Sequence, residues 1–249
     1  MLDFVALINS VGALTDMVTC DKSENPGHEL ARKAYFKEDY DKAYNIWLEN
    51  ANNGDMHAQA WIGSMYANGD GREANSDKAF LWYLSAAKQG YAMAQANVGV
   101  AYYTGNGTDK NLANAIKWFK KAANLEDLNG LFNLAVLYSK GEVSKNNENS
   151  QKKAASLYKK ASERGHYPSQ SRLGYMYSVG IGVQKDRVQA YLWLTLASQH
   201  GIGTALTALE NVIESMSSEE KAAGISLFEE WRKKTKSNEG PTAIYPTPK

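Results

Sequence analysis

The chain has 249 residues, which is enough for one large domain or two ordinary ones. Its formal net charge of +1 excludes the strongly basic nucleic-acid-binding proteins and the acidic tail proteins as classes. The single cysteine excludes an intramolecular disulfide. The four histidines are dispersed along the chain and form no cluster with the spacing of metal ligands. We therefore expect no metal site and no cofactor.

Residues 1–27 begin with an apolar run, from Phe4 to Thr15, that is too short and interrupted for a transmembrane helix. One interpretation is an amphipathic helix that packs onto the next part of the chain, with one apolar face made of Phe4, Leu7, Val11, Leu14 and Val18. The alternative is an export signal with a lipid anchor on Cys20, although Asp3 replaces the usual basic start. With a signal the protein is exported to a bacterial envelope, the periplasm or the medium, and without one it is cytoplasmic.

Residues 28–201 contain an internal repeat, found by comparing the chain with itself. A glycine or alanine, a tyrosine three residues later and a glycine three residues after that recur in four copies. An alanine in the second half of each copy recurs after 36, 39 and 36 residues, as Ala79, Ala115, Ala154 and Ala190. The three extra residues lie in the polar loop of the third copy.

Each copy predicts two helices, because apolar residues recur at helical spacing on both sides of a glycine loop. Four residues before each marker alanine is a residue that favours helix N-caps: Asn75, Asn111, Ser150 and Asp186. Asp39, four residues before Ala43, predicts a fifth unit upstream. Glycines close most of the second helices, at Gly54, Gly90, Gly165 and Gly201, and we expect a different turn where Glu126 replaces one.

Close helix packing is predicted at the small residues of the first helices, which are Gly63, Gly99, Ala135 and Gly174. We expect the rings of Trp82, Trp118 and Trp193 to fill the space beside them. Each hairpin is apolar on both sides, so that the hairpins are predicted to stack into a solenoid.

The stretches "AQAWIGSMYANGDGREANSDKAFLWYLSAAKQG" and "SQSRLGYMYSVGIGVQKDRVQAYLWLTLASQHG" resemble the Sel-one-like repeat family, relatives of tetratricopeptide repeats. The third copy departs most, because its loop has Gly141 but no second glycine and Leu157 replaces the tryptophan. The resemblance implies an all-α, right-handed superhelical solenoid of about five two-helix repeats of about 36 residues.

After Gly201 the period stops. Residues 202–233 predict C-terminal capping helices that shield the last repeat, the second of which opens with a capping box of Ser217 and Glu220. Residues 234–249 are polar and contain prolines, so we expect a disordered tail.

The sequence provides no catalytic motif. The glycine loops recur at one fixed place in each hairpin, which indicates a turn and excludes a phosphate loop. No serine lies in a G-x-S-x-G elbow, and we expect no enzymatic activity. A basic stretch, residues 140–164, predicts either docking of an acidic partner or an ordinary solvated helix face.

The resemblance suggests a function. If the first helices line a concave groove, as in tetratricopeptide arrays, the residues flanking their small and tyrosine positions point into it. These residues are Trp61, Ser64, Asn68, Asn97, Tyr103, Asn133, Lys140, Arg172 and Tyr175. We expect a non-catalytic scaffold or adaptor that binds a protein or peptide there. The alternatives are a repeat-borne hydrolase and a self-associating structural protein of the cell envelope.

Overall fold

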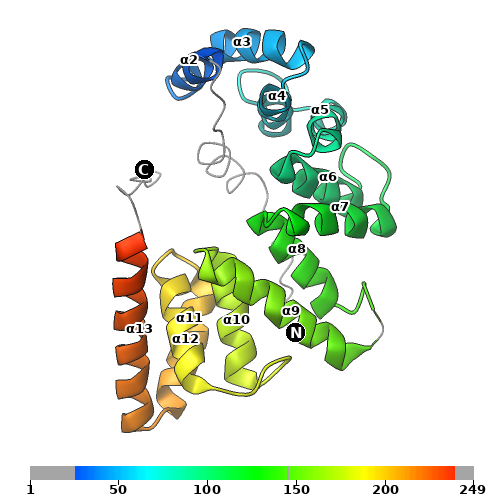
Figure 1. The fold of residues 1–249 in the computed structure, drawn as a ribbon. Coiled ribbons are helices and arrows are strands. Elements are labelled where there is room, and N and C mark those ends of the chain that lie inside the picture. Colours follow the sequence, from blue (N-terminus) through cyan, green and yellow to red (C-terminus); the bar gives the residue numbers. More distant parts are fainter. Residues whose placement is uncertain (1–25, 145, 239–249) are drawn as a thin grey trace. The chain divides into compact units, whose positions relative to one another are not determined.

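A computed structural model describes residues 26–144 and 146–238, and these contain twelve α-helices and no strand (Figure 1). The predicted all-α repeat solenoid is confirmed. No helix in the described part of the chain combines the length and the apolar character needed to cross a membrane.

The helices form two compact units, divided between residues 145 and 146. Unit 1 contains α2 (Pro26–Tyr35), α3 (Tyr40–Asn52), α4 (Met56–Asn68), α5 (Ser76–Lys88), α6 (Ala92–Thr104), α7 (Leu112–Asn124) and α8 (Leu128–Ser139). Unit 2 contains α9 (Asn147–Glu163), α10 (Tyr167–Val179), α11 (Arg187–Ser198), α12 (Gly203–Ser215) and α13 (Ser218–Asn238). The dividing point lies in the loop of the third copy, so the predicted repeat region 28–201 contributes to both units.

In unit 1 each hairpin stacks against the next, and the second helix of one hairpin contacts the first helix of the next hairpin. A buried glutamine strengthens this contact, because its amide donates to a backbone carbonyl near the end of the preceding helix. Gln59 Nε2 donates to the oxygen of Ala51 at 3.2 Å, and Gln95 Nε2 donates to that of Ala87 at 3.3 Å. Gln170 does the same in unit 2, whereas the third copy has the buried apolar Leu131 at this position.

Side-chain caps begin four of the five second helices as predicted. The oxygen of each cap accepts the backbone N–H three residues on, at 2.8–3.4 Å, and the capping residues are Asp39, Asn75, Asn111 and Asp186. The prediction for Ser150 is wrong, because α9 begins one turn earlier and Asn146 caps it at 3.2 Å. The longer loop of the third copy supplies this upstream asparagine, and α9 extends to 17 residues.

The turns after the second helices require a left-handed backbone. The predicted glycines adopt it, with φ between 77° and 100° at Gly54, Gly90, Gly165 and Gly201. Glu126 also adopts it, at φ 59°. The expected change of turn is therefore small, and a residue with a Cβ carries the strain.

The small residues of the first helices permit close packing, but the side chains nearest to their glycines are not the predicted tryptophans. A Cβ on Gly63 would lie 3.0 Å from the ring of Tyr83, and one on Gly99 would lie 2.6 Å from the ring of Phe119. Gly174 faces Leu194 in the same way. The contact residue is one position after the predicted tryptophan, which is a rotation of about 100° around the helix.

The second glycine of each loop lies against the start of the preceding second helix. A Cβ on Gly107 would collide with the carbonyl of Ser76, and one on Gly182 would collide with that of Gln151. The third copy has Val143 at this position.

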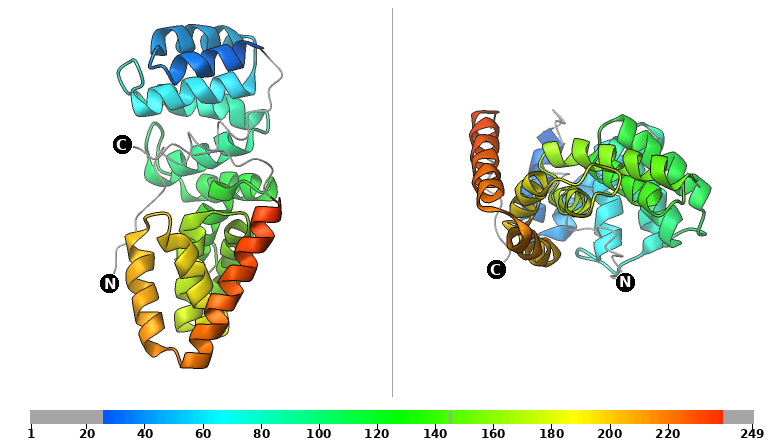
Figure 2. Two further views of the ribbon diagram at one scale, coloured as in Figure 1. Left: turned by 90° about the vertical axis from the view of Figure 1, so that its left-hand side faces the viewer. Right: turned by 90° about the horizontal axis from the view of Figure 1, so that it is seen from below.

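The helices α12 and α13 cover the end of unit 2 as predicted (Figure 2). Trp231 of α13 meets Trp193 edge to face, with ring centroids 4.8 Å apart. The capping box is confirmed, since Ser217 N donates to Glu220 Oε2 at 2.9 Å and Glu220 N donates to Ser217 Oγ at 3.2 Å. The helix continues to Asn238, so residues 234–238 are helical where a tail was expected. The predictions for residues 1–25, including Cys20, and for 239–249 lie outside the described residues.

Candidate functional site

The predicted groove residues belong to the first helices, except Lys140, which directly follows α8, and three of them are buried. Trp61, Ser64 and Asn133 are 1%, 2% and 4% exposed. The Trp61 ring stacks on Trp47 with centroids 4.3 Å apart, and Tyr35 of α2 lies 5.4 Å from it. The upstream hairpin therefore covers α4, and these three side chains belong to the core rather than to a binding surface.

Asn68 is half-buried and braces the loop after α4. Its Nδ2 donates to Asp70 Oδ2 at 3.1 Å and to Ser64 Oγ at 3.4 Å. Asp70 also accepts the hydroxyl of Tyr35 at 2.7 Å. Burial, together with this hydrogen bond to the carboxylate, raises the pKa of Tyr35 far above its ordinary value. The network is structural, because it joins α2 to the first glycine loop.

Tyr103, Lys140 and Glu142 form a cluster that we call the Tyr103 cluster. Lys140 Nζ donates to Tyr103 Oη at 3.0 Å, and Tyr103 Oη donates to Glu142 Oε1 at 3.3 Å. Tyr103 lies near the end of α6, and Lys140 and Glu142 come just after α8, so the contact between α6 and α8 brings them together. Lys140 is exposed, whereas Tyr103 and Glu142 are half-buried. Glu142 Oε2 has no hydrogen-bond partner among the described residues.

Asn97 lies on α6, two turns before the end of that helix, and is half-buried. Its Nδ2 has no hydrogen-bond partner in the described part of the chain. This differs from the amide of Gln95, whose Nε2 holds two helices together. This Asn97 donor is buried as well as unpaired, so only the rest of the amide is open to a partner.

Arg172 and Tyr175 lie on α10 of unit 2. Tyr175 is 50% exposed, and Arg172 is half-buried. The predicted residues are thus divided between two units, and we treat the two surfaces separately. Sequence reasoning missed Glu142, although it lies one repeat period after Asn106 and could have been found by that spacing.

Two polar pairs resemble catalytic ones but serve helix ends. His166 Nδ1 lies 2.7 Å from Ser169 Oγ at the start of α10, and Ser169 is fully buried, so no substrate reaches its hydroxyl. His28 lies 3.0 Å from Asp55, whose Oδ1 accepts the N–H groups of His57 and Ala58 at 2.9 Å. Burial raises the pKa of Asp55, but these hydrogen bonds outweigh it and hold that pKa below its ordinary value. Within the described ranges no group of three His, Cys, Asp or Glu could hold a metal ion.

Solved structures show the same fold. A protective antigen present in uropathogenic Escherichia coli strains, which displays an SLR fold, matches with a TM-score of 0.71 and 25% identity over 84% of this chain and 46% of its own. A Sel1 repeat protein from Oxalobacter formigenes matches with a TM-score of 0.61 and 30% identity over 69% of this chain and 49% of its own. This chain spans about half the length of these two proteins.

A third structure, of a putative sel1 repeat protein from Klebsiella pneumoniae, matches with a TM-score of 0.50 and 17% identity. The match covers 82% of this chain and 98% of that protein, and it supports the fold alone. No curated protein matches the sequence. The Sel1 repeat family model matches residues 57–91, 92–127, 129–166 and 168–202, which together make up more than half of the chain. The chain therefore belongs to the Sel1 repeat family, whose members are generally protein-interaction scaffolds.

Proposed function

We propose that this chain is a non-catalytic scaffold whose unit 1 binds an extended segment of a partner protein along its first helices, at Asn97 and the Tyr103 cluster. The observation that carries the proposal is the cluster itself. A phenol, an ammonium and a carboxylate from two successive repeats meet within 3.3 Å while the lysine stays exposed.

The chemistry of these groups suits recognition of a peptide. The Tyr103 ring offers a flat amphipathic surface, which is a frequent anchor in protein interfaces. The exposed ammonium of Lys140 recognises a carboxylate of the partner, and the amide oxygen of the half-buried Asn97 accepts a backbone N–H, whereas Glu142 Oε2 and Asn97 Nδ2 are buried and face the protein. Because α6 holds Asn97 and Tyr103, and hydrogen bonds join Lys140 and Glu142 to the Tyr103 hydroxyl, little conformational entropy is lost when a partner binds.

Affinity capture and mass spectrometry together test the proposal. The wild-type chain is compared with the double variant Asn97→Ala/Lys140→Glu and with a control, Asn45→Ala/Lys117→Glu. The control changes the same residue types at exposed sites on the second helices α3 and α7. Captured partners are then titrated in purified form against all three proteins.

We expect partner affinity to fall about tenfold or more in the first double variant and to stay within about twofold in the control. Melting temperatures of the three proteins should agree, because none of the changed side chains lies in the core. Equal partner affinity for both double variants would refute the assignment.

A further inference from the structure

The end of the first helix of the fourth copy and the loop after it carry an exposed apolar strip that the other copies lack. Tyr175, Val179 and Ile181 are 50%, 44% and 41% exposed. Where this copy has Val179, the earlier ones have Asn68, Thr104 and Lys140, and where it has Ile181, they have Asp70, Asn106 and Glu142. The repeat fold therefore does not require apolar residues at these two positions, and exposed apolar patches of this kind mark interaction sites.

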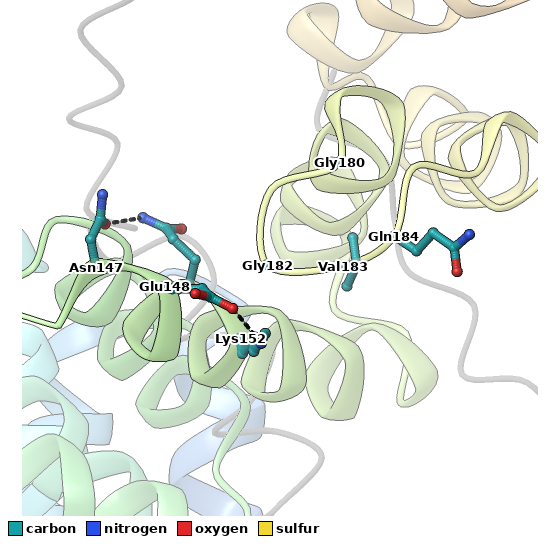
Figure 3. Close-up of a pocket in the computed structure, with 8 residues that line it drawn as sticks. Asn147, Glu148, Lys152, Gly180, Gly182, Val183 and Gln184 are labelled. Carbon is teal, nitrogen blue, oxygen red and sulfur yellow. Dashed lines mark hydrogen bonds and ion pairs between the residues drawn. The ribbon is translucent and has the colours of Figure 1, made fainter.

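A pocket adjoins the strip through the loop that contains Ile181. Glycines 180 and 182 on either side of that residue line the pocket, as do Val183 and Gln184, and the opposite wall is the start of α9 (Figure 3). Its volume is about 720 Å³, and the α9 wall consists of Asn147, Glu148, Gln151 and Lys152.

The pocket originates from the extra turn of α9. Gly182 packs against Gln151, at the position where second helices begin in the other copies. Because α9 begins at Asn147, its additional turn projects past this contact and stands beside the loop. In unit 1 the corresponding helices α3 and α5 begin at the contact itself, with Tyr40 and Ser76.

Basic residues outnumber acidic ones on the segments that form the strip and the pocket. Lys152 lines the pocket, Lys153 and Lys185 are exposed next to its lining residues, and Arg172 precedes Tyr175 by one helical turn. The acidic side chain that lines the pocket is Glu148, which pairs with Lys152 at 2.6 Å. Asp186 directly follows Lys185, so the four basic residues stand against two acidic ones, and the remaining excess of positive charge complements an acidic partner.

We propose that Tyr175, Val179, Ile181 and the adjoining pocket form a second docking surface, which binds an acidic segment of another protein through an apolar anchor residue. The anchor covers Val179 and Ile181, while neighbouring carboxylates of the segment face Lys152 and Lys185. The amide of Gln151 bonds the extended backbone of the segment. This surface lies on unit 2 and is independent of the function proposed for unit 1.

Selection of a random 12-residue peptide library, displayed on phage, against the full chain tests this inference. Enriched peptides are synthesised with a fluorescent label, and their affinity is measured by anisotropy at low and high salt. Ile181→Glu is the test variant. Ile225→Glu is the control, because Ile225 is 52% exposed on α13 of the same unit.

We expect enriched peptides with net negative charge and a large apolar residue, whose binding weakens as salt rises. Ile181→Glu should reduce their affinity about tenfold or more, whereas Ile225→Glu and Asn97→Ala/Lys140→Glu should leave it within about twofold. The inference is overturned if no peptide is enriched, if the enriched peptides are neutral or basic, or if Ile181→Glu binds them normally. Self-association that Ile181→Glu abolishes, with no peptide bound, would identify a second copy as the occupant and would also overturn it. Loss of binding in the unit 1 variant alone would also overturn the inference, because the peptides would then bind unit 1.

Discussion

Replacing Gly99 with alanine should destabilise unit 1, although alanine is the better helix former. An ideal Cβ at this position lies 2.6 Å from Cδ1 and Cε1 of Phe119, whereas carbon atoms in contact are normally about 3.5–4.0 Å apart. Phe119 is 1% exposed, so the ring must move by about 1 Å within a closely packed core. Overpacking of this kind costs about 1–3 kcal/mol, against a gain of about 1 kcal/mol in helix propensity. We expect a net loss of up to about 2 kcal/mol for Gly99→Ala, and about 3 kcal/mol or more for Gly99→Leu.

Urea denaturation of the full chain measures this loss, and hydrogen exchange of the α6 and α7 amides localises it. Gly63→Ala should be milder, since its Cβ would meet the Tyr83 ring at 3.0 Å. Gly203→Ala is the control, because nothing lies within 4 Å of a Cβ there, and this variant should be neutral or slightly more stable. If Gly99→Ala gains stability as Gly203→Ala does, the packing role of Gly99 is refuted.

Four further substitutions test the turns and the half-buried His166. Gly182→Ala should destabilise unit 2 by about 2 kcal/mol in urea denaturation, because φ is 69° and the new Cβ would collide with the carbonyl of Gln151. Glu126→Gly should stabilise unit 1 by up to about 1 kcal/mol, because glycine adopts the left-handed backbone without strain. Gly90→Ala should destabilise unit 1 by about the same amount, and the urea midpoints of the two variants measure both effects. Burial lowers the pKa of His166 to about 4, so the folded state disfavours the proton that the unfolded state binds below its ordinary pKa of about 6.5. The free energy of unfolding should therefore have its full value above about pH 6.5 and fall by about 1.4 kcal/mol per pH unit between about pH 6.5 and about pH 4. His166→Asn should flatten this pH dependence, which thermal melts recorded across the range measure.

The features that sequence reasoning predicted correctly are those that a few neighbouring residues determine. A cap such as Asn75 needs one side-chain oxygen three residues before a free N–H, and the capping box of Ser217 and Glu220 needs no other part of the chain. Gly90 meets a backbone requirement that any helix end of this type imposes. The repeat period then shows these local features in every copy, so the all-α stacked fold could be read from the sequence.

The errors concern contacts between elements. The spacing of Trp61 predicts a groove position, but Tyr35 of α2 covers its ring. The hairpin that contains α2 has no glycine loop, so the repeat pattern did not show that it stacks on α4. Tyr83 rather than Trp82 faces Gly63, because a rotation of one residue decides which side chain meets the neighbouring helix. The site shows the same limit, since Tyr103 was predicted but its partner Glu142 was not.

The third copy provides a direct test of how an insertion changes the surface of unit 2. Deletion of residues 147–149 restores the common repeat length and places Asn146 directly before Ser150, which was expected to be the N-cap from its spacing. Because serine is a good N-cap, we expect the shortened α9 to form and the free energy of unfolding to change by about 1 kcal/mol or less. The deletion also removes Asn147 and Glu148 from the pocket, so peptides selected on the wild-type chain should bind about tenfold more weakly while Ile181 stays unchanged. Loss of the folded state, measured by circular dichroism, would show that the extra turn is needed for folding. Unchanged peptide affinity in a folded variant would show that the pocket does not contribute to docking.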